Sequence, residues 1–88
     1  MIVRSRAQST VEVELVVAFD GTGIISERVM LETNDQETFE EVLTETGGYE
    51  IRGITEDARI IESVSIRDRE TDAQLVVIAE NELRVDTV

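Results

Sequence analysis

The sequence lacks cysteine, histidine, lysine, proline and tryptophan, and it has only three aromatic residues in a chain of 88. Without cysteine and histidine, the chain offers no disulfide, no thiol chemistry and no zinc site of the usual kind. Acyl-transfer and redox enzymes usually place His, Cys or Lys at the reacting centre, so these classes are excluded in their common forms. We therefore expect no enzymatic activity, no catalytic residue, no cofactor and no evident small-molecule substrate.

Three acidic clusters are the remaining candidates for a metal site. They occupy residues 35–37, 55–57 and 69–72. None has the alternating oxygen ligands and the central glycine of an EF-hand loop. The sequence therefore predicts a solvated acidic surface, with no specific metal site.

The charge of the chain is strongly unbalanced. Twenty acidic residues face eight basic ones, all eight of them arginine, which gives a net charge of −12. In multimolar salt the Debye length falls to about 3 Å or less, so dense carboxylates repel one another only weakly. An acidic chain without lysine resembles the proteins of salt-in halophiles such as haloarchaea. The alternative is an acidic protein from a GC-rich genome, in which codon bias favours arginine. An acidic surface also argues against direct binding to nucleic acid or to a membrane.

The first strong pattern is a strand followed by a hairpin. Apolar residues alternate with polar ones from Val11 to Phe19, which is the period of a half-buried strand. We expect a three-residue loop at 21–23, because a two-residue loop at 20–21 would mix the two faces. The expected register pairs Val13 with Leu31 and places Glu12 opposite Glu32, which is a repulsive pair.

The period changes after Leu31. Residues 34–46 predict a helix, because Asn34 and Glu37 fit a capping box and Phe39, Val42 and Leu43 form an apolar stripe. Gly47 would end this helix. Strands are then expected at 49–54, 59–69, 73–79 and 83–88, and the strand at 73–79 is expected to be central because it is apolar on both faces.

These elements predict a single α+β domain over residues 1–88, in which one helix packs on a small, mostly antiparallel sheet. The order ββαβββ resembles the ubiquitin-like β-grasp fold, which implies a role as an adaptor or regulatory domain. Modifiers of that family end in a glycine pair, whereas the pair in this chain, Gly47–Gly48, is internal. The resemblance therefore does not extend to a modifier.

The two ends of the chain are the candidate interaction sites. Arg4 and Arg6 make residues 1–8 positive, and a positive arm can dock on an acidic neighbour. The alternative is that Ile2 and Val3 begin a strand. At the other end, Leu83, Arg84 and Val85 belong to an expected edge strand. The arm hypothesis implies that the fold does not need the arm, because the apolar pattern begins at Val11.

The function predicted from these features is that of a small structural or interaction protein. It would self-associate or contact neighbouring subunits of a larger assembly in high salt, and the best single choice is a capsid or tail component of a haloarchaeal virus. Such a protein would be made in the cytoplasm and found in the virion. A β-grasp-like adaptor is the main alternative, and an acidic mimic of DNA is a third.

The halophilic interpretation predicts that salt stabilises the fold. We expect the thermal unfolding temperature to rise as KCl increases from about 0.1 M, because screening then acts at the spacing of neighbouring carboxylates. Circular dichroism during heating measures this temperature. A flat or falling curve would contradict the halophilic interpretation.

Overall fold

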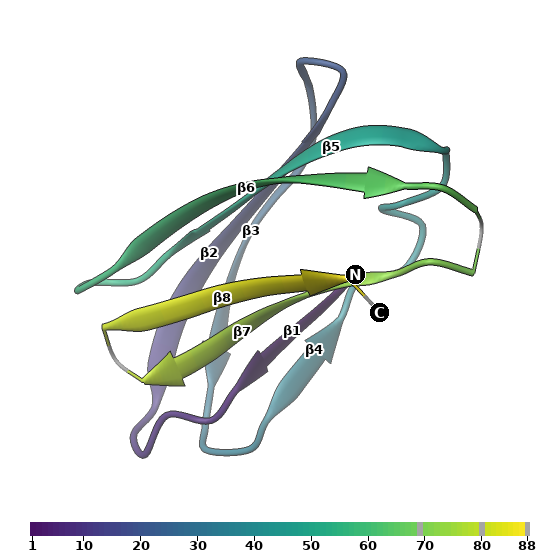
Figure 1. The fold of residues 1–88 in the computed structure, drawn as a ribbon. Coiled ribbons are helices and arrows are strands. Elements are labelled where there is room, and N and C mark those ends of the chain that lie inside the picture. The colour runs from purple at the N-terminus through teal and green to yellow at the C-terminus, as the bar shows by residue number, and fades with distance from the viewer. Residues whose placement is uncertain (69, 80, 88) are drawn as a thin grey trace.

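The computed structural model describes residues 1–68, 70–79 and 81–87, and it is a sandwich of two four-stranded β-sheets (Figure 1). The strands are β1 (Ile2–Ser5), β2 (Val11–Phe19), β3 (Thr22–Leu31), β4 (Gln36–Thr38), β5 (Gly47–Ile54), β6 (Arg59–Ile66), β7 (Ala73–Ala79) and β8 (Glu82–Thr87). No helix forms in the part of the chain that the structure describes.

Each sheet has its own strand order. The first, called here the β1 sheet, has the order β4-β1-β7-β8, and the second, the β2 sheet, has the order β3-β2-β5-β6. Strands β1 and β7 run parallel, and the other pairs are antiparallel. Strand β6 lies beside β8 at one side of the sandwich, and β3 lies beside β4 at the other.

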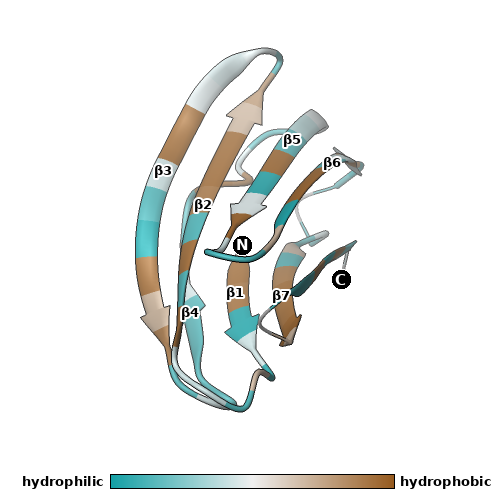
Figure 2. Ribbon diagram, turned by 90° about the vertical axis from the view of Figure 1, so that its left-hand side faces the viewer, coloured by the Kyte–Doolittle hydropathy of each residue, from teal (hydrophilic) through white to brown (hydrophobic). Residues whose placement is uncertain are grey.

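The core lies between the sheets and consists mainly of β-branched residues. Brown apolar segments recur along the strands of both sheets, interrupted by polar ones (Figure 2). The largest core side chains below 2% exposure are mostly Val, Leu and Ile, and they are Val3, Ser5, Val13, Leu15, Val17, Leu31, Ile51, Leu75 and Val77. The β-branched residues of the sequence thus fill a sheet-on-sheet interior, as their strand preference favours.

The predicted α+β class, with its ββαβββ order and its β-grasp-like helix, is wrong. Residues 36–38 form β4, and residues 39–46 are irregular. Asn34 does not cap a helix, because its φ of 63° is left-handed, and Glu41 has a φ of 59°. A helix here would also stack Glu37, Glu41 and Glu45 at spacings of four residues, where like charges destabilise it.

Strand β1 forms hydrogen bonds with backbone groups of the segment that was predicted to be a helix. The N–H of Asn34 donates to the carbonyl of Ser5 at 2.9 Å, and the N–H of Ser5 donates to the carbonyl of Asp35 at 2.9 Å. Further along, the N–H of Phe39 donates to the carbonyl of Met1 at 2.8 Å. The apolar residues of the predicted stripe still pack on the core, with Val42 5% exposed. Burial was therefore predicted correctly here, although the local structure was not.

The predicted three-residue loop at 21–23 is wrong, because the β2–β3 hairpin turns at residues 20–21. Asp20 and Gly21 both have positive φ, at 49° and 81°, which is the signature of a type I′ turn. Phe19 therefore faces Thr22, and a bulge next to Val17 and Ala18 restores the agreement of the two faces.

This register changes the charge pairs across the hairpin. Glu12 lies opposite Met30, so the expected repulsion with Glu32 does not occur. Glu14 lies opposite Arg28, and their side chains form an ion pair at 3.5 Å.

The later strands follow the predictions closely. Strand β5 includes the predicted 49–54, and β7 has the predicted bounds and lies between two neighbours in its sheet. Strand β6 ends at Ile66, earlier than the predicted 69, and Arg69 lies outside the described residues. Strand β8 is an edge strand as predicted, and its predicted last residue, Val88, also lies outside them.

Residues at the N-terminus are an interior part of the β1 sheet. Strand β1 lies between β4 and β7, and Val3 is fully buried. The α-amino group of Met1 lies 2.7 Å from Asp72 Oδ1 and donates to the carbonyl of Phe39 at 3.3 Å. Ile2 and Val3 do lie in a strand, but in a separate one from that which starts at Val11. Removing this segment would take an interior strand out of the sheet, so the fold does depend on it.

Gly53 of β5 faces a buried side chain of the other sheet and leaves no room for a Cβ atom. A Cβ atom there would lie 2.7 Å from Leu75 Cδ2, and Leu75 is fully buried. We expect Gly53→Ala to lower the free energy of unfolding by about 1–3 kcal/mol, because overpacking forces Leu75 out of place. The matched control is Gly48→Ala on the same strand, where a Cβ meets nothing within 4 Å. Urea denaturation compares the variants, and equal loss in both would contradict this account.

Candidate protein-interaction surface

The structure divides the predicted interaction residues between two strands of the β1 sheet. Ile2, Val3 and Arg4 lie in β1, and Arg6 follows that strand. Leu83, Arg84 and Val85 lie in β8. Strand β7 separates β1 from β8, so the two predicted sites share one sheet but are not adjacent strands. Their role in binding a partner stays a prediction.

Two of these residues lie on either side of the same β7 residue, on the outer face of the β1 sheet. Arg4 and Arg84 both lie opposite Val76, one on each side. Val76 is only 1% exposed although it faces away from the core, which indicates that the long arginine stems cover it. Arg84 also pairs with Asp86 at 2.9 Å, and Arg4 donates to Gln36 Oε1 at 3.4 Å. The arginines at these positions therefore have a packing role within the chain.

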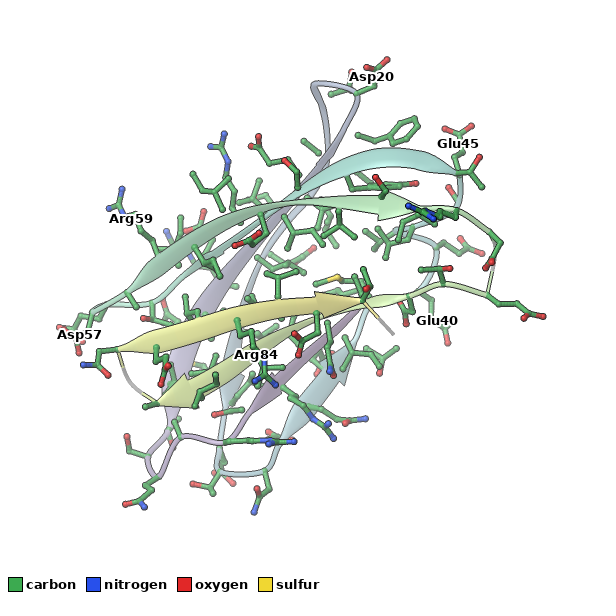
Figure 3. All side chains as sticks on the ribbon, in the orientation of Figure 1. Asp20, Glu40, Glu45, Asp57, Arg59 and Arg84 are labelled. Carbon is green, nitrogen blue, oxygen red and sulfur yellow. The ribbon has the colours of Figure 1, made fainter. Side chains whose placement is uncertain are left out.

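More than half of the acidic residues that the structure describes lie in turns and loops, whereas most of the described arginines lie in strands. The labelled acids in Figure 3, which are Asp20, Glu40, Glu45 and Asp57, lie on turns and loops, whereas Arg59 and Arg84 lie on strands. The segment 32–46 alone holds six acidic residues and no basic one. Carboxylates are thus concentrated around the loops and arginines on the faces of the sheets.

The outer face of the β2 sheet has balanced charge. Residues directly opposite in a sheet share a face, and Val13, Leu15 and Val17 point to the core, so the alternate positions point outward. The charged residues on this face are Glu12, Glu14, Arg28, Glu50, Arg52 and Arg59, three of each sign. Arg52 and Glu50 form an ion pair at 2.7 Å. On a chain of net charge −12, this face has no net formal charge.

The same sheet carries the exposed apolar side chains. Ile24, Met30 and Ile61 are 42%, 61% and 56% exposed, and they are the large hydrophobic residues exposed among those the structure describes. Ile24 and Met30 lie on β3 and Ile61 lies on β6, so all three lie on the two edge strands of one sheet. Sequence reasoning missed this surface. The signal was present, because Met30 and Ile61 occupy polar-face positions of alternating strands.

Side-chain oxygens within the acidic clusters or next to them hold turns. Asp35 Oδ1 accepts the N–H of Gln36 at 3.0 Å, and Thr55 Oγ1 accepts the N–H of Ala58 at 3.0 Å. Asp68 accepts the Thr71 hydroxyl and the N–H groups of Glu70 and Thr71. Within residues 1–68, 70–79 and 81–87, no group of three or more acidic side chains is placed to hold a metal ion.

No protein-family description, curated protein or solved structure matches the chain. Among the described residues there is also no helix long and apolar enough to cross a membrane.

The Asp68 turn yields a prediction with a defined pH range. The hydrogen bond from the Thr71 side chain, followed by those from the Glu70 and Thr71 backbone, holds the pKa of the Asp68 carboxyl below its ordinary value. A lowered pKa stabilises the fold at pH values above the unfolded-state pKa of about 4, and this contribution is lost as the pH falls through the folded-state pKa. Asp68→Ala should therefore lower the unfolding temperature at neutral pH, and the difference should close below about pH 4.

Glu70→Ala is the matched control for this variant, because Glu70 joins the turn through its backbone N–H. Differential scanning calorimetry across the pH range measures both variants. A difference between wild type and Asp68→Ala that persists unchanged at low pH would show that the carboxylate charge is not responsible.

Proposed function

We propose that the protein is a non-enzymatic structural subunit, which assembles with neighbouring subunits in a high-salt environment. The observation that carries this proposal is the position of Ile24, Met30 and Ile61. These exposed apolar residues lie on the two edges of one sheet, and the outer face between those edges has balanced charge.

The chemistry of this surface is that of a protein contact. A long, exposed edge strand offers unpaired backbone groups with which another chain can pair, and here both such strands also carry exposed apolar side chains. Arginine and methionine are enriched in protein interfaces, and both occur on the β2 sheet. Its balanced charge also supports association, because a second acidic chain approaches this face without the net repulsion that the loops present.

The setting that we propose is the shell or tail of a haloarchaeal virus, with the virion as the final location. The lysine-free acidic composition supports high salt, and a small all-strand subunit with exposed edges suits packing against neighbours. A monomeric adaptor that binds another protein through the same sheet is the second candidate. The balanced outer face of the β2 sheet supports either role.

The test is the absolute mass in solution, measured by light scattering on a sizing column in about 3 M and about 0.15 M KCl, which differ several-fold in Debye length. We expect an oligomer in high salt that dissociates at low salt. Introducing charge at the apolar positions, through Met30→Glu and Ile61→Glu, should leave a folded monomer in both conditions.

Thr38→Glu is the control, because Thr38 is an exposed residue on an edge strand of the other sheet. It adds the same charge and should still assemble. A wild-type monomer in both salts would refute the assembly and favour the adaptor, and loss of assembly in the control would show that added charge alone prevents it.

A further inference from the structure

Both edge strands of the β2 sheet carry a glutamate on the side that faces the core. Glu27 of β3 lies directly opposite Leu15, and Glu62 of β6 lies directly opposite Ile51. Both partners are fully buried, and opposed residues share a face of the sheet, so both glutamates lie on the core side, where they remain exposed at the edges. Inward-facing charges are a recognised device against the pairing of sheet edges.

The two edge strands of this sheet, β3 and β6, are complementary to each other. The sheet has the order β3-β2-β5-β6, and each neighbouring pair is antiparallel, so β3 and β6 run in opposite directions. A second copy that continues the sheet therefore sets its β3 antiparallel to β6 of the first. The outer faces of both copies then lie on the same side, and the free backbone groups of the two edges alternate in phase.

One register fits the side chains of the two edges. If Met30 lies opposite Ile61 of the next copy, these two exposed side chains cover each other, and Leu31 lies opposite Ile60. No like charges are then directly opposed. Sliding β3 by two residues in one direction would oppose Glu27 to Glu62, and sliding it further would oppose Arg28 to Arg59.

In the preferred register the two glutamates lie on a diagonal. Glu27 is opposite Val64 of the next copy, and Glu62 of that copy is opposite Val29. Diagonal neighbours in an antiparallel pair are about 7–8 Å apart. This distance is shorter than the Debye length of about 10 Å at 0.1 M salt and longer than that of about 3 Å at 1 M. The repulsion therefore acts at low salt and is screened at high salt.

We propose that copies of this chain join edge to edge, with β6 of one against β3 of the next, and that Glu27 and Glu62 make this contact dependent on salt. The proposal rests on the proposed function. It identifies the partner as a second copy of this chain, and it attributes the salt dependence of assembly to the two glutamates. Because the contact uses different surfaces on the two copies, it repeats and produces an open chain of subunits unless rotation closes it into a ring.

Charge reversal tests the contact between the two glutamates. Glu27→Arg and Glu62→Arg should each assemble at about 0.15 M KCl, because each turns the diagonal repulsion into an attraction that acts within the Debye length. We expect at least a doubling of the mass relative to wild type in light scattering. The double variant Glu27→Arg/Glu62→Arg restores like charges and should again be monomeric at low salt. When mixed with wild type, however, the double variant should co-assemble with it.

Glu12→Arg is the control, because Glu12 is an exposed glutamate on the outer face of the interior strand β2. It makes the same change in charge and should remain monomeric at low salt, and circular dichroism checks that every variant is folded. If Glu27→Arg and Glu62→Arg behave like Glu12→Arg, the edge contact is wrong. Wild-type assembly in high salt would then leave the proposed function standing through another surface, whereas a wild-type monomer there would refute both.

Discussion

The fold depends on the backbone hydrogen bonding of one short strand, β1. It lies between β4 and β7, parallel to the latter. The carbonyl of Ser5, and that of Met1 next to the strand, accept hydrogen bonds from the segment that follows β3. Buried backbone groups must be paired, so a segment that satisfies them in a sheet cannot also form a helix. With β1 in place, the chain closes into two sheets of equal size, and the residues of 34–46 become part of the β1 sheet and its rim.

The division of charge follows from the same architecture. A sandwich this small has two outer faces and a set of connecting loops, and the strands must alternate to build the core. Carboxylates around the loops are far from the core and well solvated. Arginine, with a long apolar stem, can lie flat on a sheet and cover residues such as Val76. The faces of the sheets are therefore less acidic than the composition suggests, and the outer face of the β2 sheet is balanced.

The edge strands of each sheet have no hydrogen-bonded neighbour on one side, and the edge strands of the two sheets differ in length. Strand β4 of the β1 sheet has only three residues, whereas β3 and β6 of the β2 sheet are long and exposed. The chain has neither proline nor lysine to protect these edges. Each of these strands carries a glutamate on its core side, and the repulsion between such glutamates depends on ionic strength. An edge guarded in this way suits a subunit that assembles under one salt condition and stays apart under another.

By itself, the sequence determined which residues are buried and where most strands run. Period-2 alternation predicted β2, and the apolar run at 73–79 predicted an interior strand, because both patterns report local solvent contact. The apolar residues Phe39, Val42 and Leu43 were likewise assigned to the core correctly. Only the tertiary structure decided what that segment became, since its hydrogen-bond partners lie in and next to β1, far away along the chain.

The same distinction holds for the hairpin and the candidate surface. A bulge beside Ala18 makes a two-residue turn compatible with the faces, and a bulge has no clear mark in the sequence. Strand order places Met30 and Ile61, with the two edge glutamates, on opposite edges of one sheet. Strand order is a long-range property, set by which strands pair across the whole chain, and local periodicity carries no information about it.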